Sequence, residues 1–579
     1  MHDLVIRGGT LVDGTGRPAA TGDVAVEGGI IREVGHVTTP GRREIAADGL
    51  LVTPGWVDLH THYDGQVTWD SQLAPSFWQG VTTLLMGNCG VGFAPVRPDR
   101  RAWLIELMEG VEDIPGTALS DGIQWQWESF PDYLDALARS PHAMDVGAMM
   151  GHGALRSYVM DERGAANEAP TPDDLARMHQ LVADAMAAGS FGVSTSRTIG
   201  HRALDGRPVP GTFADHQELR AIATSIAAAG HGQLQVAPAG LAAGDWADAM
   251  DEIGWITALS AETGCPISYL LAQQMDNAEE WRDRLNRTLG SAASGARVTP
   301  QVFARGVGLL SGLAGWFHPF MAAPAWQGLA SLPLAARLER IRNDASLQAR
   351  LAAEGRASAA TPPAKPGLGP HWFEPWDRIY RFANQGDYEP DAADSIAGIA
   401  AASGRDPWAV ALDLLLREGA FLWCPVLGYA GGNLDPLREM ILDDRTVMGG
   451  SDGGAHCSFI CDGSSPTFML THWVRDRRRG ARLPLEFVIR KQTFDAARSV
   501  GLSDRGRLLP GLRADINLID FAALDCGPAH MVADLPGGAQ RLMQKASGYV
   551  ATLVAGQPIR EGADDTGARP GRLVRSVAG

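Results

Sequence analysis

Apolar residues follow two different patterns along the chain, and the patterns predict two kinds of structure. Residues 4–35 form short β-branched runs interrupted by Gly-Gly and Asp-Gly, which is typical of antiparallel hairpins. The same texture returns at 514–521 and 549–559. Because neither end alone buries much surface, we expect the two ends to pair in one small β-sandwich, comprising residues 1–50 and 508–563.

Between these ends, short apolar runs alternate with helical stretches. The runs end in polar or glycine-rich residues, where a parallel barrel keeps its chemistry. The connectors at 172–189 and 215–230 have amphipathic spacing and end in glycine, as helices do. The pattern predicts an α/β fold with a (β/α)8 TIM-type barrel over residues 51–507. Its eight runs lie at 51–62, 81–90, 145–153, 191–197, 233–238, 266–273, 297–306 and 446–452.

Two segments fall outside this alternation. Residues 325–420 separate the last two predicted strands and are mostly helix-like, so we expect an insertion that covers the active face of the barrel. Residues 564–579 carry no core signal, and we expect this tail to lie free or against a neighbouring molecule.

Composition narrows the class of protein. The chain has 579 residues, 45% of them hydrophobic, and a net charge of −17, which argues against nucleic-acid and anionic-membrane partners. No run is long enough for a membrane helix, the N-terminal segment has no secretory pattern, and the six cysteines lack a disulfide spacing. We therefore expect a cytoplasmic protein that acts on a small molecule, with association into a homo-oligomer left open.

The first candidate chemistry is the pair His60 and His62 at the end of the first predicted barrel strand. Residues two apart on a strand point to the same side, so both imidazoles face the same way. Two imidazoles that converge in a barrel mouth are poor core filling and good metal ligands. The pair predicts a metal site, and the alternative is an incidental buried pair.

Four segments together resemble a known family. They are VTPGWVDLHTHYD on the first strand, GVTTLLMGNCGVGFAPVRP on the second, GHGALR on the third and SDGGAH on the eighth. They resemble the amidohydrolase superfamily, and within it the D-aminoacylase (N-acyl-D-amino-acid deacylase) branch. The segment GRLLPGLRADINLIDF resembles the return of that family from barrel to β-domain. The resemblance spans nearly the whole chain and implies a metal-dependent amide hydrolase.

Asp452 and Cys89 complete the candidate ligand set. Asp452 ends the eighth strand in GGSDGG, where glycines let the backbone approach a ligand closely. The resemblance implies that Asp452 is both a metal ligand and the general base, whereas the alternative is a turn aspartate. Cys89 lies in GNCG at the end of the second strand. The resemblance implies a thiolate ligand there in place of a carboxylated lysine, because all three lysines lie away from the fourth strand.

Strands five and six depart from the D-aminoacylase pattern, which places a metal-binding histidine on each. Here they offer Gln233, Gln235 and Gln273, and His231 stands before strand five. Amide oxygens bind zinc more weakly than imidazole. We therefore expect one zinc ion, with a second left open, held by His60, His62, Cys89 and Asp452 or completed by a loop histidine. The loop candidates are His152, His201 and His456, of which His456 is also a candidate partner of the ligands.

Two arginines are candidates for holding a substrate carboxylate, because guanidinium groups pair with carboxylates through two hydrogen bonds. Arg197 follows strand four and Arg305 follows strand seven, and a structural ion pair is the alternative for each. His152, between two glycines, is a further candidate for a hydrogen bond to substrate. These residues predict hydrolysis of an N-acyl amino acid or related N-acyl compound. The alternatives are a metal-dependent hydrolase of a cyclic imide, lactam or ester, and a non-catalytic repurposed barrel.

Overall fold

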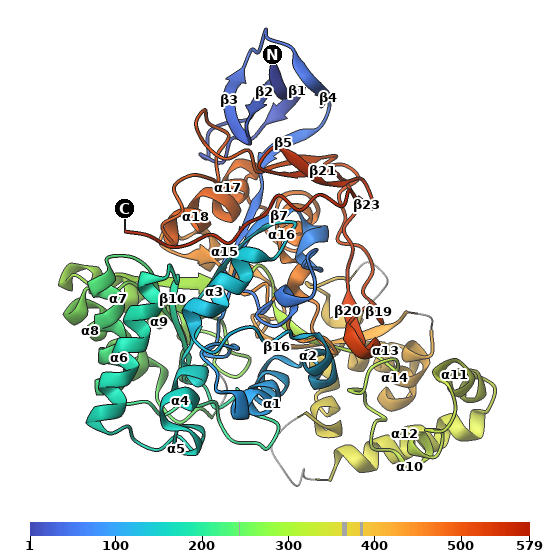
Figure 1. Cartoon of the computed structure of the whole chain (residues 1–579). Helices are drawn as coiled ribbons and strands as arrows, with labels where there is room; N and C mark the ends of the chain where they lie inside the picture. The colour runs from blue at the N-terminus through green and yellow to red at the C-terminus, as the bar shows by residue number, and fades with distance from the viewer. Residues whose placement is uncertain (242–243, 362–367, 383–385, 418, 579) are drawn as a thin grey trace.

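The structure is a computed structural model, and it describes residues 1–241, 244–361, 368–382, 386–417 and 419–578. It has a mixed α/β fold in which strands from both ends of the chain form one nine-stranded sheet (Figure 1). In spatial order this sheet contains β23 (Asp564–Asp565), β22 (Gln557–Glu561), β21 (Tyr549–Val554), β18 (Ile516–Ile519), β5 (Leu51–Pro54), β1 (His2–Leu11), β2 (Ala20–Glu27) and β3 (Ile30–Gly35), with β4 (Gly41–Ala46) beside β1. The ends meet where β5 pairs with β18.

The central strands pair in parallel in two sheets. The first contains β6 (Trp56–Asp58), β7 (Val81–Met86) and β8 (Asp145–Ala148). The second contains β9 (Met150–Gly151), β10 (Gly192–Ser196), β11 (Gln233–Ala237), β12 (Ile267–Leu271), β13 (Val298–Val302) and β17 (Val447–Met448). Met149 alone separates β8 from β9, and a parallel bridge between Thr61 and Gly453 joins the far edges of the two sheets. Parallel strands place their carboxyl ends together.

Helices connect these strands and cover them from outside (Figure 1). The predicted helices at 172–189 and 215–230 are confirmed as α6 (Pro172–Ala187) and α7 (His216–Ala229). Thr171 begins α6 with a capping box, and Gly230 ends α7 in the left-handed conformation. The other helices on the chain before the insertion are α1 (Arg101–Glu112), α2 (Gly116–Gly122), α3 (Phe130–Arg139), α4 (His152–Met160), α5 (Glu162–Ala165), α8 (Ala249–Thr263) and α9 (Glu280–Gly290).

The segment before the last parallel strand is mostly helical. It contains α10 (Pro324–Gln327), α11 (Leu334–Arg342), α12 (Ala345–Ala359), α13 (Ile396–Ser403) and α14 (Pro407–Leu415), at the lower right of Figure 1. A small antiparallel sheet of β14 (Val307–Ser311), β16 (Phe421–Leu427) and β15 (Tyr380–Phe382) connects it to the rest of the molecule. After it come α15 (Asp435–Leu442), α16 (Ser465–Phe468), η9 (Met469–Asp476), α17 (Leu485–Arg490), η10 (Lys491–Asp495) and α18 (Ala496–Ser499). A two-stranded sheet of β19 (His530–Val532) and β20 (Arg541–Met543) lies near the insertion.

Two expectations differ from the structure. The apolar run at 51–62 is not one strand: β5 joins the sheet of the chain ends and β6 joins the parallel strands, because Gly55 separates them. The tail does not lie free. Gly571 N donates to His142 O (2.9 Å) and Val574 N donates to Val146 O (2.8 Å), so the tail lies along the amino end of β8. Extended backbone can pair without an apolar pattern, so the residues of the tail carry no signal that predicts this contact.

Among the described residues, no helix combines the length and the apolar character needed to span a membrane.

Candidate metal centre

Four predicted ligands meet at the carboxyl ends of the parallel strands. His60 and His62 follow β6, Cys89 follows β7 and Asp452 follows β17. One ligand atom from each of His60, His62 and Cys89 lies within 4.8 Å of the others, and all three side chains are buried. His60 Nε2 is 3.2 Å from Cys89 Sγ. Asp452 Oδ1 is 3.5 Å from His60 Nε2 and 3.6 Å from His62 Nε2. These side chains can surround one cation.

Backbone pairing sets this geometry. His62 N donates to Gly453 O (2.8 Å), and Asp452 N donates to His60 O (3.2 Å), so the extensions of β6 and β17 lie side by side. Cys89, Asp452 and His456 all have positive φ, at 55°, 48° and 53°. Such conformations cost free energy for residues with a Cβ and cluster at functional sites. The chain therefore holds these three residues in place through the surrounding fold.

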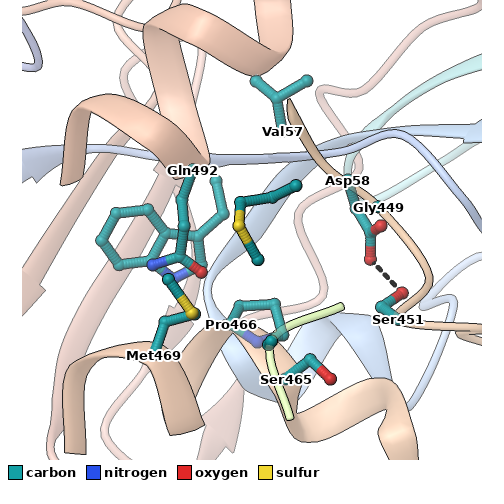
Figure 2. Close-up of a pocket in the computed structure, with 11 residues that line it drawn as sticks. Val57, Asp58, Gly449, Ser451, Ser465, Pro466, Met469 and Gln492 are labelled. Atoms are coloured by element: carbon teal, nitrogen blue, oxygen red, sulfur yellow. Dashed lines mark hydrogen bonds between the residues drawn. The ribbon is translucent and has the colours of Figure 1, made fainter. Parts of the chain in front are cut away.

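A hydrogen bond below the four ligands fastens the same two strands. Figure 2 shows Asp58 and Ser451 facing each other, and Ser451 Oγ donates to Asp58 at 2.5 Å. Asp58 also accepts from His60 N at 3.3 Å. A small pocket of about 30 Å3 lies beside this pair, lined also by Met469 and Gln492. Asp58 thus fixes the backbone that carries His60.

Two residues that sequence reasoning missed contact the imidazoles from behind. Gln301, on β13, is 3.1 Å from His60 Nδ1 through Oε1, and its Nε2 donates to Ser268 Oγ. Glu112, the last residue of α1, is 3.4 Å from His62 Nδ1 through Oε1. Its other oxygen is 3.6 Å from His456 Nε2, the residue predicted as a partner of the ligands. Partners of this kind orient metal-binding histidines. No local motif marks Glu112, because only the fold brings α1 to His62.

The charges around the site favour a cation. Burial alone would raise the pKa of Asp452, but His62 and His60 outweigh it and hold that pKa well below its ordinary value. Burial lowers the pKa of His60 to about 4. For His62 burial acts in the same direction, yet Glu112 and Asp452 outweigh it and raise the pKa to about 9. The carboxylates of Glu112 and Asp452 therefore both face His62 and stabilise its protonated ring. A metal cation bound at the site can take the place of that proton.

The donors also fit zinc by their chemistry. Both ring nitrogens of His62 and Oε1 of Glu112 are buried without a hydrogen-bond partner among the described residues. Buried polar atoms without partners are costly, so the site suits a ligand that would engage them. Burial and the nearby carboxylates raise the pKa of the Cys89 thiol, so its thiolate form requires a neighbouring cation. Imidazole, thiolate and carboxylate are the donors that zinc prefers.

The structure does not bring His152, Arg197 or Arg305 to these ligands. Both ring nitrogens of His152 are used, at 2.9 Å from Thr195 Oγ1 and 2.9 Å from Glu218 Oε1. Arg197 Nε donates to Glu252 (2.6 Å), and its guanidinium lies over two tryptophans.

Arg305 is buried beneath Tyr388 and donates to Asp462 (3.0 Å) and to Cys461 O (2.6 Å). Each arginine is thus paired with a buried carboxylate, and a contact of either one with substrate stays a prediction. The physical reason is burial: an arginine withdrawn from water needs a fixed anion, and Glu252 and Asp462 supply it.

The remaining candidates divide between the two ends of the strands. Gln235 lies at the site, where its Oε1 accepts from Cys89 N at 3.0 Å. Gln273 instead accepts from Ala430 N (3.2 Å), which ties the end of β12 to the loop after β16. His201 is 2.9 Å from Ser196 Oγ at the end of β10. Burial, followed by the charges of His456 and His62, lowers its pKa to about 3.

Gln233 and His231 lie at the opposite end of the strands from the four ligands. Together they line a separate pocket there, beside Ser576 of the tail. His231 Nδ1 is 3.1 Å from Ser576 Oγ. Neither residue can contribute to the metal site, because each precedes or begins β11 while the ligands follow their strands.

Parallel strands that carry a cluster of metal ligands at their carboxyl ends are typical of metal-dependent α/β enzymes. Comparison with known families identifies which family this is. Residues 43–560 match the family described as "Amidohydrolase family", so the chain belongs to that family.

Individual relatives add detail. The chain is 36% identical over 194 residues to the D-aminoacylase of Alcaligenes xylosoxydans xylosoxydans, a match that spans 33% of this chain and 37% of that protein. It is 27% identical over 601 residues to an uncharacterized protein of Mycobacterium tuberculosis, covering 97% of this chain and 92% of the relative. The solved structure of the N-acyl-D-glutamate deacylase of Bordetella bronchiseptica, complexed with zinc and a phosphonate inhibitor, matches with a TM-score of 0.64 at 22% identity and 99% coverage of both chains. That likeness shows a shared fold.

Proposed function

We propose that the protein is a zinc-dependent hydrolase that cleaves the amide bond of an N-acyl amino acid or related N-acyl compound. The observation that carries this proposal is the meeting of His60, His62, Cys89 and Asp452, with Asp452 Oδ1 within 3.6 Å of both imidazoles. The D-aminoacylase relative and the zinc-bound deacylase structure support the reaction class.

His60, His62, Cys89 and Asp452 would hold the zinc ion. When bound, zinc polarises a carbonyl and makes water acidic enough to attack it at neutral pH. Asp452 Oδ1 faces the imidazoles, which leaves Oδ2 to accept the proton of the attacking water and deliver it to the departing amine. The low pKa of Asp452 keeps this carboxylate ionised. Gln301 and Glu112 keep the two rings in position.

The donor set supports one ion. The two glutamines on strands five and six that reach this end are occupied: Gln235 by Cys89 N, and Gln273 by Ala430 N. His152, the best placed of the loop histidines by sequence, has both nitrogens engaged. Gln235, Gln273 and His152 are thus committed to other partners, whereas His201 and His456 stay candidates for completing the ligand set.

The architecture completes the proposal. The parallel pairing and the bridge between Thr61 and Gly453 support a closed (β/α)8 barrel over residues 51–507 with the helical insertion at about 325–420. Side chains on both faces of β1 are buried, Leu4 and Ile6 in one cluster and Val5 in another, which supports a small sandwich of residues 1–50 and 508–563. The six cysteines form no disulfide in the described chain, which supports a reducing, cytoplasmic setting. Homo-oligomer formation remains part of this proposal.

The test combines metal quantification with product analysis. We expect about one zinc per chain, and hydrolysis of at least one member of a panel of N-acyl D- and L-amino acids, detected as the addition of one water by mass spectrometry. Removal of zinc with a chelator should abolish hydrolysis, and adding zinc back should restore it. A zinc-free preparation with full activity would overturn the proposal, and a metal-free, inactive protein would favour a non-catalytic role.

A further inference from the structure

A pocket at the carboxyl end of the parallel strands lies beside His201. It has a volume of about 490 Å3, within the range of roughly 300–1,000 Å3 typical of small-molecule sites. Thr198 and His201 enter it from the loop after β10, and Met275 enters from the loop after β12. Val426 enters from β16, and Ile379 from just before β15. The pocket therefore lies between the parallel strands and the insertion.

His201 connects this pocket to the strand end that lies beside Cys89. His201 lines it and is hydrogen-bonded to Ser196 at the end of β10. Gly90, the residue after Cys89, lies against the same end of β10: Gly90 N donates to Ser194 Oγ at 2.9 Å, and a Cβ on Gly90 would lie 2.7 Å from Ser196 N. A group bonded to an amide held at the four ligands therefore has this pocket beside it, across Ser196 and His201.

The lining is mainly apolar. Leu241, Met275, Ile379, Cys424 and Val426 supply hydrocarbon and sulfur surface. The two charged side chains at the pocket, Asp276 and Arg378, are both exposed and of opposite sign, so they give it no net charge. Selection there must depend on apolar contact, because neither sign of charge is favoured.

The wall formed by the insertion is fastened in place. Gln274 pairs with Leu427 through an isolated antiparallel bridge, and Gly428 N donates to Gln273 O at 2.8 Å. Gln274 Nε2 also donates to Gly240 O, which connects the loops after β11 and β12. A pocket with fixed walls discriminates by size better than one that collapses.

We propose that this pocket binds a bulky apolar group attached to the scissile amide, so that the protein prefers N-acyl compounds with a large aliphatic or aromatic substituent over N-acetylglycine-like ones. The inference rests on the proposed hydrolysis for its substrate class. The apolar group belongs either to the acyl side or to the amino-acid side chain, and both have the same chemistry.

Two substrate series separate these sources. The first lengthens the acyl group from acetyl to octanoyl on one amino acid, and the second lengthens the side chain of an N-acetyl amino acid from glycine to norleucine. We expect kcat/KM to rise about three- to fourfold per added methylene in the series whose group enters the pocket, as burial of a CH2 group predicts. The series that rises identifies which side of the amide the pocket binds. Equal kcat/KM throughout both series would overturn the proposal.

Variants locate the effect. Val426→Trp should abolish the gain with length, because the indole would fill the pocket. Val577→Trp is the matched control, because Val577 is 72% exposed and lies on the opposite end, and it should change neither series. If Val426→Trp does not fold, Met275→Trp fills the same pocket from another segment. Equal loss on short and long substrates would overturn the proposal.

Direct binding distinguishes failure of the pocket from failure of the hydrolase. Calorimetry on the zinc-loaded protein compares octanoate with acetate and norleucine with glycine. We expect the longer member of one pair to bind at least 30-fold more tightly, and Val426→Trp to remove the difference. If this holds while no amide is cleaved, the proposed function fails and the pocket stands. If amides are cleaved but neither pair differs, the pocket assignment fails and the function stands.

Discussion

Single residues decide the chemistry of this site, because the four ligands come from the ends of three strands and differ in burial and backbone conformation. Asp452 is the least buried of them, with 14% of its side chain exposed, whereas His60 and His62 are at most 1% exposed. Its carboxylate is therefore the one that can meet both water and substrate. The backbone at Cys89 and Asp452 has positive φ, a strained conformation that is common at functional sites.

Asp452→Asn should leave the fold intact and abolish most of the activity. Asparagine has nearly the same shape but cannot accept the proton of the attacking water, so we expect kcat/KM to fall by about 10²- to 10⁴-fold. Steady-state kinetics and a thermal melt measure the two effects. Asp99→Asn, at an exposed position, is the control and should leave kcat/KM unchanged. Full activity in Asp452→Asn would contradict the proposed role.

Glu112→Gln should weaken zinc binding more than it weakens the fold. The carboxylate lies behind His62 and His456, and removing such a partner typically lowers metal affinity about 10- to 100-fold. Competition with a chromogenic chelator measures the affinity without reference to turnover. Glu109→Gln, one turn earlier on α1, is the matched control. Unchanged zinc affinity in Glu112→Gln would show that Glu112 only fills space.

At the scale of elements, the insertion is anchored by one buried carboxylate. Glu389 is 2% exposed and is 2.8 Å from Arg477, which follows η9, and 3.1 Å from His472 on η9. It also accepts from Leu434 N at 2.8 Å. Burial alone would raise the pKa of Glu389, but the bonds from His472 and Arg477 outweigh it and lower the pKa to about 2.

Glu389→Gln should therefore lower stability in a pH-dependent way. A carboxyl group whose folded pKa lies below its unfolded value of 4.5 stabilises the fold above pH 4.5, and that contribution is lost as the pH falls toward 2. We expect urea unfolding to show a deficit of about 3 kcal/mol at pH 6 that narrows between pH 4.5 and 2.5. Glu339→Gln, exposed on α11, should show no such trend. A deficit that stays constant with pH would contradict the argument.

The sequence predicted some of these elements well and others not at all, for physical reasons. Apolar runs bounded by glycine predicted the parallel strands, and the spacing of His60 and His62 predicted that both rings face one side, because these features are local. The side chains of Arg197 and Arg305 form ion pairs with Glu252 and Asp462, which are far away in the sequence, so these contacts could not be predicted locally. Glu112 reaches His62 only through the packing of α1, so no pattern in its own segment could predict it.

In the whole molecule, the candidate site lies at one end of the parallel strands, and a group of stabilising ion pairs lies at the other end. The candidate ligands and the 490 Å3 pocket occupy the carboxyl end. At the amino end, Asp145 binds Arg505 (2.8 Å) and Arg513 (2.9 Å), which connects the strands to the segment that leads into β18. Arg572 N of the tail donates to the same carboxylate at 2.9 Å. Stability can therefore change at one end without altering the site at the other.

Removing the tail after Arg569 tests this separation. The tail forms four backbone hydrogen bonds, one with His142, two with Val146 and one with Gly189, each worth about 0.5–1.5 kcal/mol, so its loss should lower the free energy of unfolding by about 2–6 kcal/mol. Because these contacts lie at the amino end, kcat/KM at 25 °C should stay within twofold. Arg575→Ala, which removes only an exposed ion pair with Asp135 and one bond to Ala188 O, should cost less than about 1 kcal/mol. Urea denaturation and steady-state kinetics of both variants measure these effects, and a truncated protein of unchanged stability that has lost activity would show that the two ends are coupled.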